Sequence, residues 1–240
     1  MTECQLEELL IHTIAEDLVN RQHVAVGASS PIPASAALLA RQRNPSLQVS
    51  LLGSEKHTSF TDGGRELFDC AAQGRIDTFF LSGIQIDGKA NVNLVGIGDY
   101  PGLKKRFAGS FGSAYLYDLV PNVILFCWAH SLTTLVQHVD FISAAGPLDN
   151  NHYRPGGPTL LITDRCLFRY RATQRGFSLV SVHEGQTVED IVTNTAFTFE
   201  VPEQVPTTTI PDGETLGILR EEIKQQMLDV YPVFAKRLWN

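Results

Sequence analysis

The sequence has few of the features that mark disulfide-bonded, secreted or membrane proteins. Its 240 residues include only four cysteines (Cys4, Cys70, Cys127 and Cys166), and no two of them form a CxxC pair. We therefore expect free thiols and a cytoplasmic protein. No apolar run approaches the ~20 residues that span a bilayer. The acidic amino terminus lacks the basic start and apolar core of a signal peptide.

Basic sequence is also scarce. The formal net charge is -7, and no basic block is interleaved with aromatic residues, so we expect no nucleic-acid partner. The one cationic run, residues 104–106, is either a solvated loop or a phosphate contact. No GxGxxG or Walker loop is present. His130 and His138 have no cysteine or carboxylate at ligand spacing. We expect no metal and no tightly bound cofactor.

What the first half does contain is an alternation of short apolar runs with amphipathic segments. Apolar runs predict strands at residues 23–26, 47–52 and 77–81. Helical periodicity predicts helices at residues 3–20, 34–41 and 64–73, with a capping box at Thr2 and Gly74 as a C-terminal cap. This alternation is typical of an α/β fold with an open, mostly parallel sheet flanked by helices.

The second half indicates an antiparallel, hairpin-rich C-terminal part within the same single domain, residues 1–240. Strands are predicted at residues 122–128, 139–144, 159–163, 166–170, 177–183 and 197–201. Helical segments are predicted at residues 114–119, 187–195 and 214–230.

Two kinds of segment point to a site. Residues 81–114 are rich in glycine and small polar side chains, and a long connection of this kind inside a compact fold is usually functional. Residues 27–31 and 53–57 follow two predicted strands, where ligands bind in open α/β sheets. The second of these loops carries Glu55 and His57, which form either a catalytic pair or a solvated charged loop.

Several segments, spread in order along nearly the whole chain, together resemble one family. They are VGASSP (26–31), SGIQID (82–87), NVN (91–93), GDY (98–100), RFAGSFG (106–112), LITD (161–164) and LVSVHEG (179–185). The chain resembles the B (β) subunit of family I coenzyme A transferases, in the branch of glutaconate CoA-transferase B.

The resemblance implies a CoA-transferase-like fold that pairs with an A (α) subunit in a heterodimer or higher heteromer, with the active site between subunits. It implies an acyl-CoA and a carboxylic acid as substrates, with coenzyme A as co-substrate. A glutamate of the B (β) subunit attacks the thioester, giving a glutamyl anhydride and then a glutamyl-CoA thioester. Backbone amides of the glycine-rich loops hold the oxyanion and CoA. The matching positions are Gly27, Ala28, Ser29, Gly83, Gln85, Gly109, Ser110, Phe111, Gly112 and Ser113.

The sequence departs from the family at the nucleophile. In relatives the glutamate directly follows the second strand, which here corresponds to Leu52 or Gly53. Either Glu55 is the nucleophile on a longer loop, or the nucleophile is lost. In the second case the chain belongs to a CoA-thioester hydrolase, lyase or decarboxylase, with His57 as a helper to acid–base groups of the partner. A third alternative is a non-catalytic subunit that shapes the site.

Overall fold

The computed structural model describes residues 4–147 and 153–240. The backbone divides into two compact units. The first consists of Met1–Phe80 and Thr209–Asn240, and the second of Leu81–Thr208. The expected single domain stays a prediction, and each unit is described by itself below.

The first unit is built on three parallel strands. They are β1 (His23–Val26), β2 (Gln48–Leu51) and β3 (Thr78–Leu81), with β1 hydrogen-bonded to both of the others. All four residues of β1 are buried, as expected for a strand of a parallel sheet that is covered on both faces.

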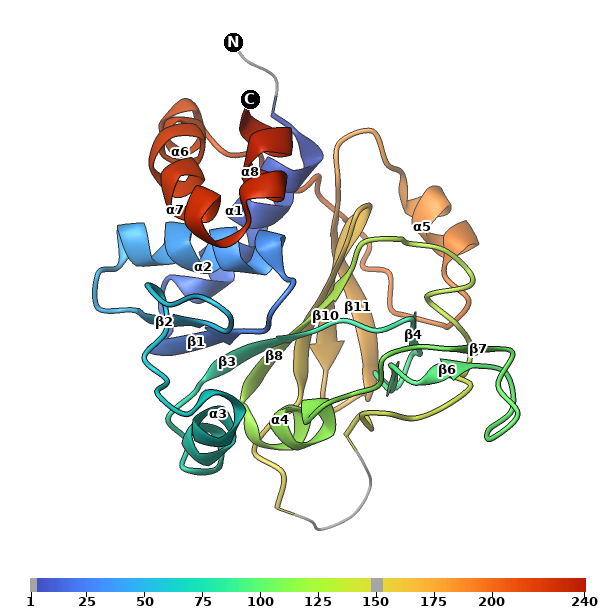
Figure 1. Ribbon diagram of the computed structural model, residues 1–240. Helices are drawn as coiled ribbons and strands as arrows, with labels where there is room; N and C mark the ends of the chain where they lie inside the picture. The colour runs from blue at the N-terminus through green and yellow to red at the C-terminus, as the bar shows by residue number, and fades with distance from the viewer. Residues whose placement is uncertain (1–3, 148–152) are drawn as a thin grey trace. The chain divides into compact units, whose positions relative to one another are not determined.

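Helices cover both faces of these strands. Figure 1 shows α1 (Leu6–Leu18), α2 (Pro31–Arg43) and the C-terminal helices on one face, and α3 (Gly63–Ala72) on the other. The C-terminal helices are α6 (Gly213–Ile218), a π-helical turn η1 (Leu219–Ile223), α7 (Lys224–Val230) and α8 (Pro232–Trp239). Gly74 follows α3 with φ +68°, which confirms the predicted cap.

A buried carboxylate ties the two ends of the chain together. Glu8 is fully buried. Its oxygens lie 2.7 Å from Nε and Nη2 of Arg220, and Oε1 lies 3.2 Å from Nε1 of Trp239. Glu8 also accepts a hydrogen bond from the amide of Gln5 and so caps α1. The capping box predicted at Thr2 lies partly outside the described residues.

The second unit combines parallel and antiparallel strands. Strands β8 (Asn122–Cys127) and β9 (Pro158–Thr163) are parallel. Strands β10 (Cys166–Arg171) and β11 (Gly176–Val182) continue from β9 in antiparallel order. The short helices α4 (Ser113–Leu119) and α5 (Val188–Asn194) accompany them. The predicted α/β class, with parallel strands first and antiparallel hairpins later, is confirmed.

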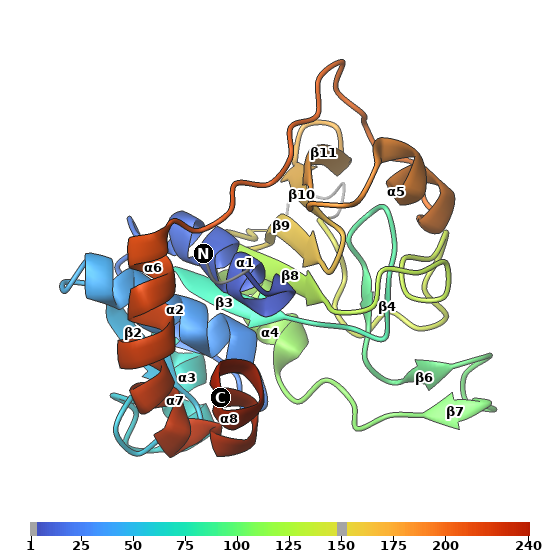
Figure 2. The same cartoon turned by 90° about the horizontal axis from the view of Figure 1, so that it is seen from above.

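The glycine-rich stretch forms two small hairpins within the second unit. β4 (Gln85–Ile86) pairs with β5 (Val92–Asn93), and β6 (Gly96–Ile97) pairs with β7 (Lys105–Arg106). The β6–β7 hairpin projects away from β8–β11 (Figure 2).

Three predicted elements are wrong. Residues 139–144 form no strand and contribute only one bridge, from Ala144 to Val92. Residues 197–201 likewise contribute one bridge, from Glu200 to Ser178. The helix at 214–230 is interrupted by the π-helical turn, and α8 follows it.

Candidate functional site

In the first unit the loops after β1 and β2 lie side by side. The amide of Leu52 donates to the carbonyl of Val26, which extends the ladder one residue beyond Leu51. Gly53 then turns the chain with φ +91°, and a Cβ atom placed on it would lie 4.0 Å from the Cβ of Ala28. Both loops therefore meet at the carboxyl ends of neighbouring parallel strands, where open α/β sheets bind ligands.

The loop of residues 27–30 presents backbone donors. Ser29 has φ +62°, a left-handed conformation that is uncommon outside glycine and that often occurs at functional sites. Ala28 and Ser29 are exposed, and within the described residues no hydrogen-bond acceptor is found for either amide. The next amide, that of Ser30, donates to the hydroxyl of Tyr231. Two adjacent amides are thus available for an incoming oxyanion.

Glu55 lies at the tip of the second loop, four residues after the last residue of β2. It is exposed, and no hydrogen bond or ion pair to its carboxylate is found in the described part of the chain. Its neighbour Lys56 is paired with Asp229 of α7 at 2.5 Å. The residue directly after the strand is Leu52, which is half-buried.

His57 faces the helices and not the loop tip. Its Nδ1 lies 3.2 Å from Nη2 of Arg41 on α2, and Arg41 also donates to Gln226 of α7. Because a guanidinium group only donates, Nδ1 must accept, and Nε2 then carries the hydrogen of a neutral ring. Burial and the charge of Arg41 lower the pKa of His57. Since the one basic nitrogen is already engaged, this arrangement does not favour His57 as a general base.

In the second unit, Gly83 and Gln85 serve the hairpin itself. Gln85 is buried, and its Oε1 accepts from Nδ2 of Asn93 and from the amide of Asp140. Gly83 packs so closely that a Cβ atom on it would lie 2.5 Å from Cγ1 of Val92. These two residues shape the backbone, and the oxygen of Gln85 is already saturated by internal donors.

The segment of residues 109–113 leads into α4. The amide of Gly109 donates to Leu94, and the amide of Ser113 donates to Ser110. Phe111 has φ +42° and an exposed fraction of 80%, and Gly112 is the N-cap of α4. The predicted members of this loop therefore lie together in one turn, with an aromatic side chain directed to solvent. Residues 104–106 on the neighbouring hairpin are exposed.

Sequence reasoning missed the contribution of the C-terminal helices. Tyr231, Asp229 and Gln226 contact the two loops after β1 and β2 or the residues that hold them. Their spacing in the sequence is that of an ordinary amphipathic helix, so no local signal distinguishes them.

Other expected features can be compared with the described residues. All four cysteines lie within them and are free of disulfides. No group of three or more His, Cys, Asp or Glu side chains there is arranged to hold a metal ion. A search of the same residues finds no helix long and apolar enough to cross a membrane.

Comparisons with known proteins agree with this arrangement. A sequence model described as coenzyme A transferase matches residues 3–194. The chain is 33% identical over 153 residues to the β chain (B) of 3-oxoadipate CoA-transferase from Pseudomonas knackmussii, and the match covers 61% of this chain and 58% of the relative. It is 30% identical to the corresponding chain (B) of glutaconate CoA-transferase from Acidaminococcus fermentans, over 60% of this chain and 56% of that protein. The matches thus span little more than half the length of these relatives.

Two solved structures share the fold. Glutaconate CoA-transferase from Acidaminococcus fermentans superposes with a TM-score of 0.82 at 22% identity, covering 95% of this chain and 98% of the other. The decarboxylase AibA/AibB superposes with a TM-score of 0.79 at 24% identity, covering 91% and 94%.

Proposed function

Because the chain belongs to the coenzyme A transferase family, we propose that it is the B (β) subunit of a CoA-transferase-like enzyme. It pairs with an A (α) subunit in a heteromer and moves coenzyme A between an acyl-CoA thioester and a carboxylic acid. The similarity to the B (β) subunits of two CoA-transferases supports this proposal. We place the reaction in the cytoplasm, with coenzyme A as co-substrate.

The proposed chemistry uses Glu55 as nucleophile. Its carboxylate oxygen attacks the thioester carbonyl, the C–S bond breaks, and the CoA thiolate leaves an acyl–glutamyl anhydride. The thiolate then attacks the glutamyl carbonyl and releases the first acid as a carboxylate. The acceptor carboxylate repeats the two steps in reverse on the glutamyl-CoA thioester, so that no net proton is taken up.

One observation carries the proposal. The amides of Ala28 and Ser29 lie on a loop next to Gly53, two residues before the exposed carboxylate of Glu55. Paired backbone donors beside a nucleophile are the arrangement that stabilises the oxyanion of an acyl transfer. The residues proposed for CoA and oxyanion binding in the second unit, Gly83 and the turn of residues 109–113, add backbone shape.

Trapping with hydroxylamine tests the nucleophile. The complex with the A (α) subunit is incubated with acyl-CoA and hydroxylamine, which converts an activated glutamyl group into a hydroxamate, and the modified residue is located by peptide mass spectrometry. We expect the label on Glu55 and a loss of transfer activity on the order of 10³ or more in Glu55→Gln. Glu203→Gln, at another exposed glutamate, is the matched control. Full activity of Glu55→Gln would exclude Glu55 as nucleophile.

A second candidate function follows from the residue after β2. Leu52 occupies that position, and Leu52 has no nucleophilic atom. This observation favours a CoA-thioester hydrolase, lyase or decarboxylase on the same scaffold, with the acid–base groups in the partner. Such an enzyme turns over acyl-CoA without an added carboxylic acid. Turnover that depends strictly on an acceptor acid would rule it out.

A further inference from the structure

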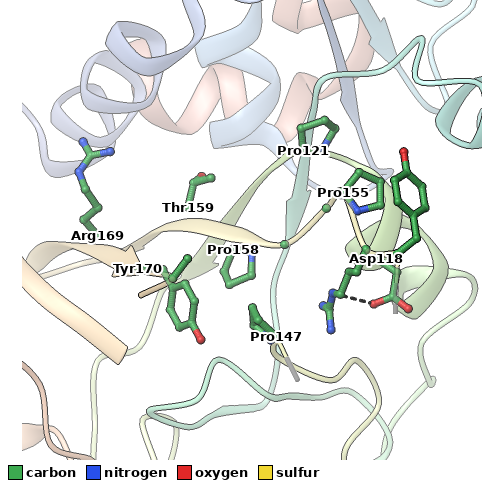
Figure 3. Close-up of a pocket in the computed structure, with 13 residues that line it drawn as sticks. Asp118, Pro121, Pro147, Pro155, Pro158, Thr159, Arg169 and Tyr170 are labelled. Carbon is green, nitrogen blue, oxygen red and sulfur yellow. Dashed lines mark ion pairs between the residues drawn. The ribbon is translucent and has the colours of Figure 1, made fainter. Parts of the chain in front are cut away.

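The second unit contains a pocket of about 630 Å³ that the proposed reaction does not use (Figure 3). It borders the amino ends of β8 and β9, and no residue assigned above to catalysis or CoA binding is among its described lining residues. Its volume falls in the range of small-molecule sites.

The walls of the pocket are preformed. Four of the lining residues are Pro121, Pro147, Pro155 and Pro158, whose rings fix the backbone. The amide of Gly156 donates to Asp118 at 2.8 Å, and a Cβ atom on Gly156 would lie 2.7 Å from the backbone nitrogen of Leu119. A rigid apolar wall of this kind loses little entropy when a ligand binds.

Arg154 braces the same walls. Its Nη1 donates to the carbonyl of Gly146 and its Nη2 to that of Ala145, at 2.8 and 2.6 Å. Its Nε lies 3.1 Å from Oδ1 of Asp118 at the end of α4, and its guanidinium group lies over the ring of Tyr117. One side chain thus joins three segments of the wall.

Tyr170 supplies an unsatisfied polar group. Its side chain extends from β10 toward Pro147 (Figure 3), and only 7% of the residue is exposed. The ring packs edge-on against Phe177, but the buried hydroxyl has no hydrogen-bond partner among the described residues. Buried hydroxyls almost always have one. Burial raises the pKa of Tyr170, so the hydroxyl keeps its proton and needs an acceptor.

The charges of the lining favour an anion. Arg154 and Arg169 face one carboxylate, that of Asp118, so that the described lining carries one excess positive charge in a chain of net charge -7. Figure 3 shows Arg169 at one end of the pocket and Asp118 at the other. Arg169 is exposed, and no ion-pair partner is found for it in the described ranges.

We propose that this pocket binds a small monocarboxylate. The carboxylate accepts a hydrogen bond from the hydroxyl of Tyr170, and the apolar body of the ligand lies against the four prolines.

Calorimetric titration of the purified full-length protein tests this proposal. The probes are benzoate, phenylacetate and hexanoate, each with its carboxamide as a neutral match. We expect saturable binding of at least one acid with a Kd of about 1 mM or tighter, and at least about tenfold weaker binding of its amide. In Tyr170→Phe the affinity falls about ten- to hundredfold, as expected when a hydrogen bond to a charged acceptor is lost. Tyr100→Phe, an exposed tyrosine outside the pocket, is the control and keeps wild-type affinity.

Two results would overturn the proposal. One is binding of no tested acid below about 10 mM, or equal binding to wild type and Tyr170→Phe, which would place any bound acid elsewhere. The other comes from thermal unfolding without ligand. Tyr170→Phe removes an unsatisfied hydroxyl and is expected to raise the Tm. A lowered Tm would mean that the hydroxyl already has a partner within the protein.

Discussion

At the scale of single residues, His130 shows how a buried imidazole is kept neutral. Its Nε2 lies 2.9 Å from the hydroxyl of Thr195, which itself donates to the carbonyl of Ile191 and therefore accepts from the ring. Its Nδ1 lies 3.0 Å from the hydroxyl of Thr163. Both nitrogens are satisfied without a charge, and burial, with the positive charge of Arg165 nearby, lowers the pKa of His130 to about 4.

This pKa predicts a loss of stability in acid. Because the pKa is lowered on folding, the unfolded chain takes up the proton first, and stability falls as the pH drops from about 6.5 to about 4. The contribution is on the order of 3 kcal/mol. Urea unfolding followed between pH 7 and pH 4 measures it. His130→Gln is expected to flatten this dependence, whereas a change at the exposed His138 is not. An equal slope in His130→Gln and wild type would contradict the assignment.

Gly83 gives a second prediction at this scale. Gly83→Ala places a methyl group 2.5 Å from Cγ1 of Val92 and 3.1 Å from the carbonyl oxygens of Asn93 and Gln85. We expect destabilisation by about 1–3 kcal/mol, measured by denaturant unfolding. The control is Gly217→Ala in α6, where no atom lies within 4 Å, and which is expected to stabilise by about 0.5–1 kcal/mol. A neutral Gly83→Ala would mean that the β4–β5 hairpin yields.

The sequence identified many of the residues that shape the two loops, but it misread the role of some. The glycines at 27, 83 and 109 do occupy turns. Gln85 looks in the sequence like a site residue because it is polar and flanked by glycine, yet Asn93 and Asp140 occupy its oxygen. The contact with Asp140 joins residues 55 positions apart, and no local pattern encodes it.

At the scale of elements, the contact between α1 and η1 decides how the C-terminal helices are held. Arg220→Met leaves the fully buried carboxylate of Glu8 without its cation. We expect a loss of about 3 kcal/mol in unfolding free energy, because an unpaired buried charge is costly. The pair Arg237–Glu7 is more exposed on the arginine side, and Arg237→Met is expected to cost less than about 1 kcal/mol.

The double variant Glu8→Gln with Arg220→Met separates charge from packing. If the unpaired charge is the cause, Glu8→Gln recovers most of the stability that Arg220→Met loses. Equal stability of the double variant and Arg220→Met would instead assign the loss to packing.

Elements with an apolar run were predictable, and those without were not. Residues 197–201 alternate like a strand because Phe197 and Phe199 pack into an aromatic cluster with Phe168. That alternation reflects packing and not a ladder of hydrogen bonds. The start of α8 had a usable signal, since Pro232 stands at its first turn and proline favours that position.

At the scale of the whole molecule, the alternation of strands and helices correctly predicted an α/β fold, because continuous apolar strands belong to covered parallel sheets. The return of the chain to its first unit after residue 208 was not predictable. Residues 214–230 have the pattern of a generic amphipathic helix, and their partners lie about 200 positions earlier, as in the pair Arg220–Glu8.

This organisation predicts a pattern of hydrogen exchange. Helices α1, α2 and α6–α8 belong to one compact unit and are expected to exchange their amides as one cooperative group. In Arg220→Met, exchange is expected to accelerate in α1 together with α6–α8, while β9–β11 change little. Mass spectrometry of peptides after native-state exchange measures this. Acceleration confined to residues 213–239 would show that α1 is held independently.

The discontinuous first unit also has a consequence for synthesis on the ribosome. Its strands β1–β3 emerge early, but the helices that supply Arg220 and Trp239 to Glu8 are the last part of the chain to be translated. The second unit is continuous in sequence and is complete before them. Proteins usually fold from the amino terminus as they are made. Here the middle of the nascent chain is the first part that can finish, and the amino-terminal segment has to wait for release.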